Sequence, residues 1–281
     1  MESLTKFPSK KIGRDQRIKK VVKMNPSKSI SEKSSTKPIC SVIIPVFNGL
    51  HYTKDCINSV LNEKSRTPFE IIVVDAGSSD GVEKFLAECG EQIKLLSLPE
   101  NLGFGHAVNF GSVAAEGDYI ITLHSDTMPV PGWLDNMLSL AETDPNISIV
   151  GSKQLYPLHS LIQHSGIVFN SNHKPIFIYQ GFPDDHSAVN KQREFPAVTD
   201  VCMLIRSEVF DDLSGFDDRF KNGFEDFDLC LRARFAGTKV VYQPQSVVYH
   251  YAESDERYYS LNTPNSKLFA SIWNDRIKSD A

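Results

Sequence analysis

Residues 40–48, CSVIIPVFN, form a short apolar run that closes on the turn pair Asn48-Gly49. A polar, lysine-rich segment precedes this run, and residues 52–63 after it have the composition of a helix. An apolar run of this length, bounded by turn residues, is typical of a strand buried on both faces. We therefore predict a buried strand that leads into a helix.

The same order of strand and helix returns three times further along the chain. The predicted pairs are 69–75 with 82–89, 93–98 with 105–115, and 119–123 with 132–143. Strands that alternate with helices predict an α/β fold with a doubly wound, mostly parallel sheet. Ligands bind such sheets at the carboxyl ends of the strands. This chain places polar residues there, namely Asn48, Asp75, Asn101 and the triplet His124-Ser125-Asp126.

The alternation loosens after about residue 148, so we expect a smaller, mixed second half. Strand-like segments at 149–155, 166–169 and 198–205 are followed by an acidic helix and by a strand-like segment at 239–251. We predict one folded domain over residues 39–255, with a parallel first half at 39–147 and a mixed second half at 148–255. Residues 1–38 are predicted as a flexible basic arm and residues 256–281 as a C-terminal tail.

Composition favours a globular protein with a sizeable core. Of the 281 residues 41% are hydrophobic and 10% aromatic, and no run approaches the roughly 18 apolar residues of a membrane span. The N-terminus lacks the apolar stretch of a secretory signal, so we expect a cytoplasmic protein. The five cysteines are scattered without a CxxC pair, which predicts neither a disulfide framework nor a zinc site.

The charge is concentrated at the N-terminus. Residues 1–38 carry eleven Lys and Arg against three Asp and Glu, a net charge of about +8. Because the whole chain has a net charge of −5, the remaining residues carry about −13. The arm is read either as a solubilising tail or as a peripheral contact with anionic lipid at the inner face of a membrane. The acidic body has no basic stripe interleaved with aromatics, so nucleic-acid binding is not expected.

Residues 222–232, NGFEDFDLCLR, place Glu225, Asp226 and Asp228 among apolar side chains. On a helix over this segment Asp228 and Arg232 stand four residues apart and can pair. Glu225 and Asp226 then lie in the first turn, where backbone amides favour negative charge and a carboxylate can face a cleft as a general base. The alternative is that both acids only cap the helix.

Asp75 ends a predicted strand just before a turn of small residues, an arrangement that suits nucleotide recognition. A carboxylate there can accept the imide N–H of uracil or thymine, or a ribose hydroxyl, although a plain strand-to-helix turn explains the segment equally well. Residues 103–106, GFGH, lack the third glycine and the later acid of a dinucleotide fingerprint. A nicotinamide cofactor is therefore not predicted.

Asp126 stands where a divalent cation could bridge the protein and a diphosphate, because Mg²⁺ or Mn²⁺ is held by one or two carboxylates together with phosphate oxygens. His250 closes the apolar run before it and is read as a second ligand, since imidazole suits Mn²⁺ better than Mg²⁺. His124 is read as a metal ligand, a sugar contact or a turn residue.

Taken in this order, the motifs resemble those of the family 2 glycosyltransferases of the GT-A fold, over roughly residues 39–254. The matching segments are SVIIPVFN at 41–48, VDAGSSD at 74–80, NLGF at 101–104, SDT at 125–127, LSGFD at 213–217 and FEDFDL at 224–229. The resemblance implies a nucleotide-diphosphate-sugar donor (UDP- or dTDP-linked), a divalent Mn²⁺ or Mg²⁺, and displacement with inversion at the anomeric carbon. The implied acceptor is a hydroxyl of a glycan, lipid-linked or protein molecule, as in polysaccharide assembly.

The resemblance also implies that residues 39–147 are the nucleotide-binding half of a GT-A domain and residues 148–255 its acceptor-side half, and it implies roles for single residues. Asp226 would be the general base, Glu225 would orient acceptor or base, and Asp126 with His250 would hold the metal. The residues implied to bind the nucleotide sugar are Pro45, Phe47, Asn48, Asp75, Ser78, Asn101, Ser125 and Asp126. His124 replaces the usual first acid of the DxD element, which leaves the strength of metal binding open.

Two further residues are predicted at the sugar or acceptor. His164 lies where the mixed half could meet the substrate, and Trp133 could stack on a pyranose, whereas core packing is the alternative for such aromatics. Because His124 departs from the family pattern, a non-catalytic nucleotide-sugar or glycan-binding relative is the competing hypothesis, against which the intact Glu225-Asp226 pair argues.

Overall fold

The computed structural model describes residues 37–251 and 263–277. Twelve strands lie within these residues: β1 (Cys40–Val46), β2 (Phe69–Asp75), β3 (Lys94–Ser97), β4 (Tyr119–Leu123), β5 (Thr127–Pro129), β6 (Ile147–Leu155), β7 (Ile162–His164), β8 (Ile167–Phe169), β9 (Pro175–Phe177), β10 (Arg193–Glu194), β11 (Cys202–Arg206) and β12 (Lys239–His250). The helices are α2 (Leu50–Leu61), α3 (Val82–Glu88), the 3₁₀ turn η1 (Gly90–Gln92), α4 (Phe104–Ser112), α5 (Trp133–Thr143), α6 (Ser207–Asp212), α7 (Glu225–Phe235) and α8 (Pro264–Trp273).

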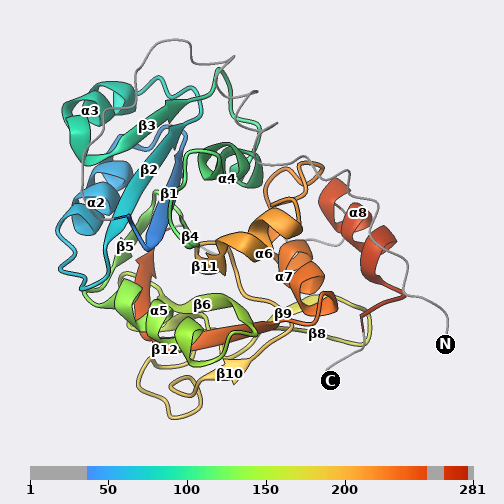
Figure 1. The fold of residues 1–281 in the computed structure, drawn as a ribbon. Helices are drawn as coiled ribbons and strands as arrows, with labels where there is room; N and C mark the ends of the chain where they lie inside the picture. The colour runs from blue at the N-terminus through green and yellow to red at the C-terminus, as the bar shows by residue number, and fades with distance from the viewer. Residues whose placement is uncertain (1–36, 252–262, 278–281) are drawn as a thin grey trace.

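One large mixed sheet forms the centre of the molecule (Figure 1). Its strand order is β10-β12-β6-β11-β4-β1-β2-β3, with β5 paired to β12 and β7 paired to β6, while β8 and β9 form a separate pair. The four neighbouring strands β4, β1, β2 and β3 run parallel to one another. Strands β2 and β4 have the bounds predicted from the sequence. The predicted α/β class with a largely parallel sheet is confirmed.

Helices cover both faces of the sheet, which explains why β1 is apolar along its length. Val42 and Ile44 pack into a cluster with α2, α3 and α5, whereas Ile43 points to the other face and packs with α4, α6, α7 and α8. Successive side chains of a strand alternate between faces. The parallel half is therefore held from both sides, and its strand ends are fixed relative to one another.

The second half of the sheet is mixed, as expected. Strand β11 runs antiparallel to both β4 and β6, and β12 runs parallel to β6. Strand β12 also pairs antiparallel with the short β5, which places His250 opposite Thr127. This last pairing brings the end of β12 to the end of β4.

Residues 263–277 contribute α8, although the sequence was read as a tail from residue 256 onward. Phe269 and Trp273 are buried in the core cluster that includes α7, and the Trp273 indole Nε1–H donates to Asp228 Oδ1 at 2.9 Å. The described part of this segment therefore packs into the domain. Of the predicted basic arm, residues 1–36 lie outside the described residues. No helix in the described part of the chain is long and apolar enough to cross a membrane.

Candidate active site

A pocket of about 340 Å³ opens at the carboxyl ends of β1, β2 and β4. Its walls come from both halves of the chain, since Asn222 of the loop before α7 lines it together with residues of the parallel half. Six of the residues predicted to bind a nucleotide sugar line this pocket: Pro45, Phe47, Asn48, Asn101, Ser125 and Asp126. The structure thus brings together residues that lie up to 81 positions apart in the sequence.

The other two predicted residues, Asp75 and Ser78, do not line the pocket but hold the turn beside it. Asp75 is 6% exposed, and its Oδ1 accepts a hydrogen bond from the Ser78 backbone N–H at 3.0 Å. The Ser78 hydroxyl in turn accepts from the Asn48 backbone N–H at 2.8 Å, and Asn48 Oδ1 accepts from the Ser79 N–H at 2.9 Å. These bonds lock the loop after β1 to the loop after β2. Ala76, next to Asp75, does line the pocket.

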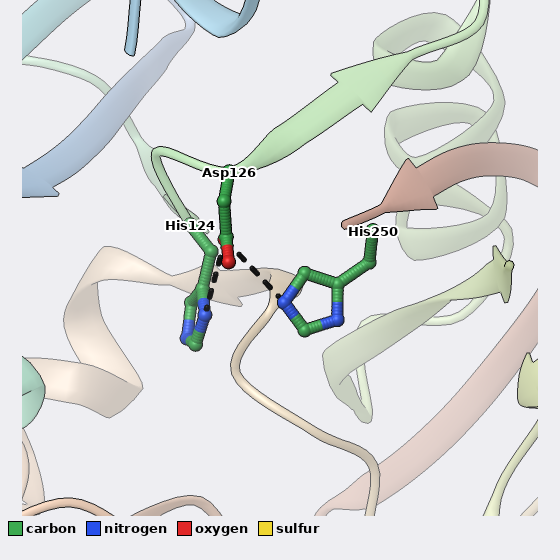
Figure 2. Close-up of side chains that lie close together, drawn as sticks. All are labelled: His124, Asp126 and His250. Atoms are coloured by element: carbon green, nitrogen blue, oxygen red, sulfur yellow. Dashed lines mark ion pairs between the residues drawn. The ribbon is translucent and has the colours of Figure 1, made fainter. Parts of the chain in front are cut away.

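Asp126 lies between the imidazoles of His124 and His250 (Figure 2). Its Oδ1 is 3.4 Å from His250 Nε2 and 3.9 Å from His124 Nδ1, and one donor atom from each residue lies within 4.8 Å of the others. The β5–β12 pairing explains this meeting, because it sets His250 opposite Thr127 and the Tyr251 N–H donates to the Asp126 carbonyl at 3.0 Å. A carboxylate and two histidines from distant segments therefore share one site.

The imidazoles of His124 and His250 stabilise the ionised form of Asp126. Burial acts to raise the pKa of Asp126, but the neighbouring His250 and His124 outweigh it and lower this pKa to about 2. Burial likewise acts to lower the pKa of His124, but its hydrogen bond to Asp200 and the charges of Asp200 and Asp126 raise it above its ordinary value. Asp126 is thus an anion at neutral pH.

This group of residues fits a divalent cation. Two imidazole nitrogens and one carboxylate oxygen are a donor set that Mn²⁺ accepts. His250 is 7% exposed, and its Nε2 is buried without a hydrogen-bond partner among the described residues. A buried nitrogen of this kind is costly unless a proton or a metal uses its lone pair. The His124, Asp126 and His250 side chains are therefore the residues that could hold a metal here.

The acidic helix begins after an unusual run of backbone conformations. Asn222, Gly223 and Phe224 all have positive φ angles, of 73°, 101° and 75°. Positive φ is strained for a bulky residue such as phenylalanine, and such strain is held only where the surroundings fix it. Asn265 of α8 fixes this loop, because its Nδ2 donates to the carbonyls of Asn222 at 3.0 Å and Gly223 at 2.9 Å.

Both acids of the first turn of α7 are buried, Glu225 at 2% and Asp226 at 1% exposure. Asp226 Oδ1 accepts from the Phe227 backbone N–H at 2.9 Å, while Asp226 Oδ2 and Glu225 Oε2 have no hydrogen-bond partner within residues 37–251 and 263–277. Burial, and then the charge of Asp200, raise the pKa of both carboxyls well above the ordinary range. Once ionised, a carboxylate whose pKa is raised is a stronger base toward an acceptor hydroxyl than an ordinary one.

Asp200 lies close to both groups of residues. Its Oδ1 is 3.3 Å from His124 Nε2, and its charge acts on Glu225 and Asp226. The metal-binding candidates and the two acids of α7 are therefore electrostatically coupled through one side chain. No sequence signal marks the pairing of Asp200 with His124, because the two residues lie 76 positions apart.

One predicted ion pair is confirmed, whereas two side chains predicted at the sugar or acceptor are buried. The Asp228–Arg232 pair is confirmed, with Oδ2 2.7 Å from Nε. Trp133, the first residue of α5, is fully buried in the core, so it cannot stack on a sugar. His164 is 1% exposed, lies outside the pocket, and packs against Phe177 with ring centroids 6.0 Å apart; burial lowers its pKa to about 3. Both side chains are therefore packed in the interior of the protein.

Two pocket residues were not singled out from the sequence. The Phe104 ring packs against His124 with centroids 4.3 Å apart, and its backbone N–H donates to Asn222 Oδ1 at 3.3 Å. Both residues line the pocket. Phe104 lies within the NLGF segment that the resemblance quotes, which is the signal that could have found it.

Comparisons with known proteins identify the family of this chain. The family model described as Glycosyl transferase family 2 matches residues 41–214, more than half of the chain. The uncharacterized protein y4gI of Sinorhizobium fredii is 32% identical over 76% of this chain, and the O-antigen biosynthesis protein RfbC of Myxococcus xanthus is 28% identical over 78%. The chain spans only 24% and 18% of the lengths of these two relatives. An N-acetylglucosaminyl-diphospho-decaprenol L-rhamnosyltransferase of Mycobacterium tuberculosis is 27% identical over 68% of this chain and 69% of its own length.

Solved structures share the fold. GalNAc-T7, crystallised with UDP, GalNAc and Mn²⁺, superposes with a TM-score of 0.69 at 16% identity, over 85% of this chain and 49% of its own. The mannosyltransferase PcManGT of Pyrobaculum calidifontis, in complex with GDP-Man and Mn²⁺, superposes with a TM-score of 0.59 at 19% identity, over 86% and 64%. At such identities the likeness concerns the fold, which is of the GT-A type. The extent of the family match shows that the chain belongs to glycosyl transferase family 2.

Proposed function

We propose that this chain moves a sugar from a nucleotide-diphosphate sugar to an acceptor hydroxyl, with inversion at the anomeric carbon. The observation that carries the proposal is the pocket at the strand ends, where Asp126 and two imidazoles meet residues suited to a nucleotide. The charge of the buried Glu225 in the first turn of α7 acts on His124, one of these two imidazoles. Such a reaction needs charge stabilisation at the leaving diphosphate and a base at the attacking hydroxyl.

The donor is proposed to be UDP- or dTDP-linked. Asp75 supports this base class, because a carboxylate accepts the imide N–H that uracil and thymine share. Its neighbour Ala76 lines the pocket, and the turn that follows is locked by the Asp75–Ser78 hydrogen bond. Of the two solved structures named above, one carries UDP and the other carries GDP-Man.

Asp126 and His250, with His124 beside them, would hold Mn²⁺ or Mg²⁺. When bound, the cation supplies positive charge to the leaving nucleotide diphosphate. Asp126 is already ionised at neutral pH because of its two imidazole neighbours. Both structural neighbours named above contain Mn²⁺, which supports a divalent metal at this place in the fold.

Asp226 is proposed to take the proton of the acceptor hydroxyl, and Glu225 to orient the acceptor or the base. Two features support these roles, namely the unpartnered oxygens of both carboxyls and the raised pKa that burial and Asp200 give them. The proton leaves the acceptor oxygen as that oxygen bonds to the anomeric carbon, and the sugar–phosphate bond breaks on the opposite face.

The acceptor is proposed to be a glycan, a lipid-linked molecule or a protein, with the lipid-linked class favoured. One relative that aligns over two thirds of its own length is named for a diphospho-decaprenol acceptor, and another for O-antigen biosynthesis. Assembly of a cell-surface polysaccharide is the process these names support.

A nucleotide panel tests the proposal. Thermal unfolding of the wild type and Asp126→Ala is measured with UDP, dTDP, GDP and CDP, each with and without Mn²⁺. A ligand at about 100 times its dissociation constant adds roughly 2.7 kcal/mol to the free energy of unfolding, which is readily seen. We expect a Mn²⁺-dependent shift with UDP or dTDP that Asp126→Ala abolishes. No shift with any nucleotide, in folded protein, would contradict a nucleotide-sugar transferase.

A further inference from the structure

Each of the two histidines at Asp126 is held from behind by a hydrogen-bond acceptor. His250 Nδ1 lies 2.7 Å from the side-chain oxygen Oε1 of Gln163, which is 2% exposed. An amide oxygen only accepts hydrogen bonds, so Nδ1 carries the proton and the lone pair of a neutral His250 is on Nε2. The Gln163 amide Nε2 also donates to the His250 carbonyl at 3.5 Å, which fixes the side chain on the strand.

In a neutral His250, this hydrogen bond from Nδ1 to Gln163 leaves the acceptor nitrogen Nε2 facing the carboxylate of Asp126. His250 Nε2 lies 3.4 Å from Asp126 Oδ1; the lone pair of a neutral His250 would repel this carboxylate, whereas a proton on Nε2 would bind it. A cation between the two atoms removes the repulsion, and a divalent metal ion is one that uses both as ligands. The orientation that Gln163 imposes is thus favourable for a metal-bound state.

His124 is held in the same way on the other side. Its Nε2 lies 3.3 Å from Asp200 Oδ1, and its Nδ1 lies 3.9 Å from Asp126 Oδ1. Asp200 is itself fixed to the end of β4, because its carbonyl accepts from Thr122 Oγ1 at 2.6 Å and the His124 N–H donates to the Val201 carbonyl at 2.9 Å. The imidazole therefore presents Nδ1 to the same carboxylate.

We propose that Asp200 and Gln163 are positioning residues that fix His124 and His250 as two nitrogen ligands flanking Asp126. This inference rests on the proposed function, in which a divalent cation acts at the diphosphate. It makes the site a two-imidazole, one-carboxylate site, which favours Mn²⁺ over the oxygen-seeking Mg²⁺. His124 then serves as a ligand in its own right, and its partner is a residue 76 positions away.

Mn²⁺ binding to the full chain, followed by electron paramagnetic resonance of free Mn²⁺ with and without UDP, tests the inference. Loss of an outer hydrogen-bond partner commonly weakens metal affinity about 10- to 100-fold, and we expect this for Gln163→Leu and Asp200→Ala. Gln163→Glu and Asp200→Asn keep an accepting oxygen and should retain most of the affinity. Nitrogen modulation in the electron spin-echo spectrum of the bound Mn²⁺ should show two imidazoles in the wild type and fall in the two truncating variants.

The chain offers a matched control. His106 Nδ1 and Asp218 Oδ1 form a second His–Asp pair, 3.4 Å apart, and neither residue lines the pocket. Asp218→Ala removes a carboxylate from a histidine at a comparable distance and should leave Mn²⁺ affinity unchanged. Thermal unfolding of each variant confirms that it is folded before Mn²⁺ is added.

The outcomes separate the two proposals. Unchanged Mn²⁺ affinity in Gln163→Leu and Asp200→Ala overturns the positioning role, even if the chain transfers sugar. Weakened affinity that the conservative variants restore supports the positioning role, even if no nucleotide sugar is turned over. Equal weakening in all four variants and in Asp218→Ala would mean that the loss is a general effect of destabilisation, and would also overturn it.

Discussion

Asp226 is a carboxyl whose surroundings oppose its charge. It is 1% exposed, and burial and the nearby Asp200 and Glu225 raise its pKa well above the ordinary range. We expect Asp226→Asn to reduce transfer by about 10²- to 10⁴-fold, because general-base catalysis contributes about that much. UDP and Mn²⁺ binding should persist, since Asp226 does not line the pocket. Initial transfer rates and nucleotide thermal shifts, measured side by side, check both statements, and near-normal transfer would remove Asp226 as the base.

Glu225 gives the free energy of unfolding a pH dependence of defined sign. Burial, and then Asp200, raise its pKa from 4.5 to about 8. Between these values the folded protein holds a proton that the unfolded chain has lost, so stability falls as pH rises through this interval. Asp226 acts in the same direction. Urea unfolding of the metal-free chain should therefore give a larger free energy at about pH 5 than at about pH 8.

Glu225→Gln is the matched variant for this pH dependence, because it keeps the shape and removes the titration. It should flatten the slope of unfolding free energy against pH and stabilise the chain at about pH 8, where the wild type keeps a partly ionised buried acid. Glu208, an exposed acid in the first turn of α6, provides a Glu→Gln control. A slope as steep in Glu225→Gln as in the wild type would contradict the assignment.

Single residues differed in how far the sequence revealed them. Asp126, Asn48 and Asn101 could be predicted, since acids and amides at strand ends have few roles other than turns and ligands. Trp133 and His164 could not be assigned, because an aromatic side chain near a site has the same sequence signature as one in the core. Their side chains are buried. Asp200 shows the opposite case, since its partner His124 is brought to it by the antiparallel pairing of β4 with β11.

At the scale of elements, helix α8 stabilises helix α7 by packing against it and by one hydrogen bond. Phe269 packs against Phe224 with ring centroids 5.1 Å apart, and the Trp273 indole donates to the buried Asp228. Trp273→Phe keeps much of the apolar contact but leaves Asp228 Oδ1 without this donor. We expect a loss of about 1–3 kcal/mol in the free energy of unfolding, measured in urea, which is typical for a buried polar group that loses its partner.

Leu268, only partly buried on the same helix, offers a comparison for that prediction. Leu268→Ala shortens an apolar side chain without touching Asp228, and its cost should be smaller. A cost for Trp273→Phe no larger than that of Leu268→Ala would mean that the indole hydrogen bond adds little. In either case α8 belongs to the folded domain, which the short polar segment before it obscured in the sequence.

The order of elements was more predictable than their pairing. The alternation of strand and helix defines β1 to β4 because β1, β2 and β4 are apolar and largely buried and each intervening helix has one apolar side. The short β5, β7 and β10, of two or three residues, carry no periodic signal of their own. They form because distant strands already lie alongside. The β5–β12 pairing that brings His250 to Asp126 therefore could not be read from local pattern, although the family motif placed both residues in one site.

At the scale of the whole molecule, the N-terminal segment and the rest of the chain carry net charges of opposite sign. About +8 lies in residues 1–38 and about −13 in the remainder. The described body begins at Lys37, whose ammonium group pairs with Asp118 of the loop before β4. An acceptor held at an anionic membrane would thus meet a body that is repelled and an N-terminal segment that is attracted. Which of the two dominates depends on distance and on salt, because exposed charges are screened over about 8 Å at physiological ionic strength.

Deleting residues 1–36, while keeping Lys37, separates these effects. A basic residue near an anionic leaflet contributes about 1 kcal/mol to binding, so we expect the full chain to bind phosphatidylserine-containing vesicles and the deletion variant to lose that binding. Thermal unfolding of the described body should be unchanged, because the Lys37–Asp118 pair is retained. Co-sedimentation with vesicles at low and high salt measures the effect, and vesicles of pure phosphatidylcholine are the control. A variant with the segment's lysines changed to glutamine keeps its length and should behave like the deletion. Equal vesicle binding by all three proteins would assign the contact to the body and leave the basic segment without a membrane role.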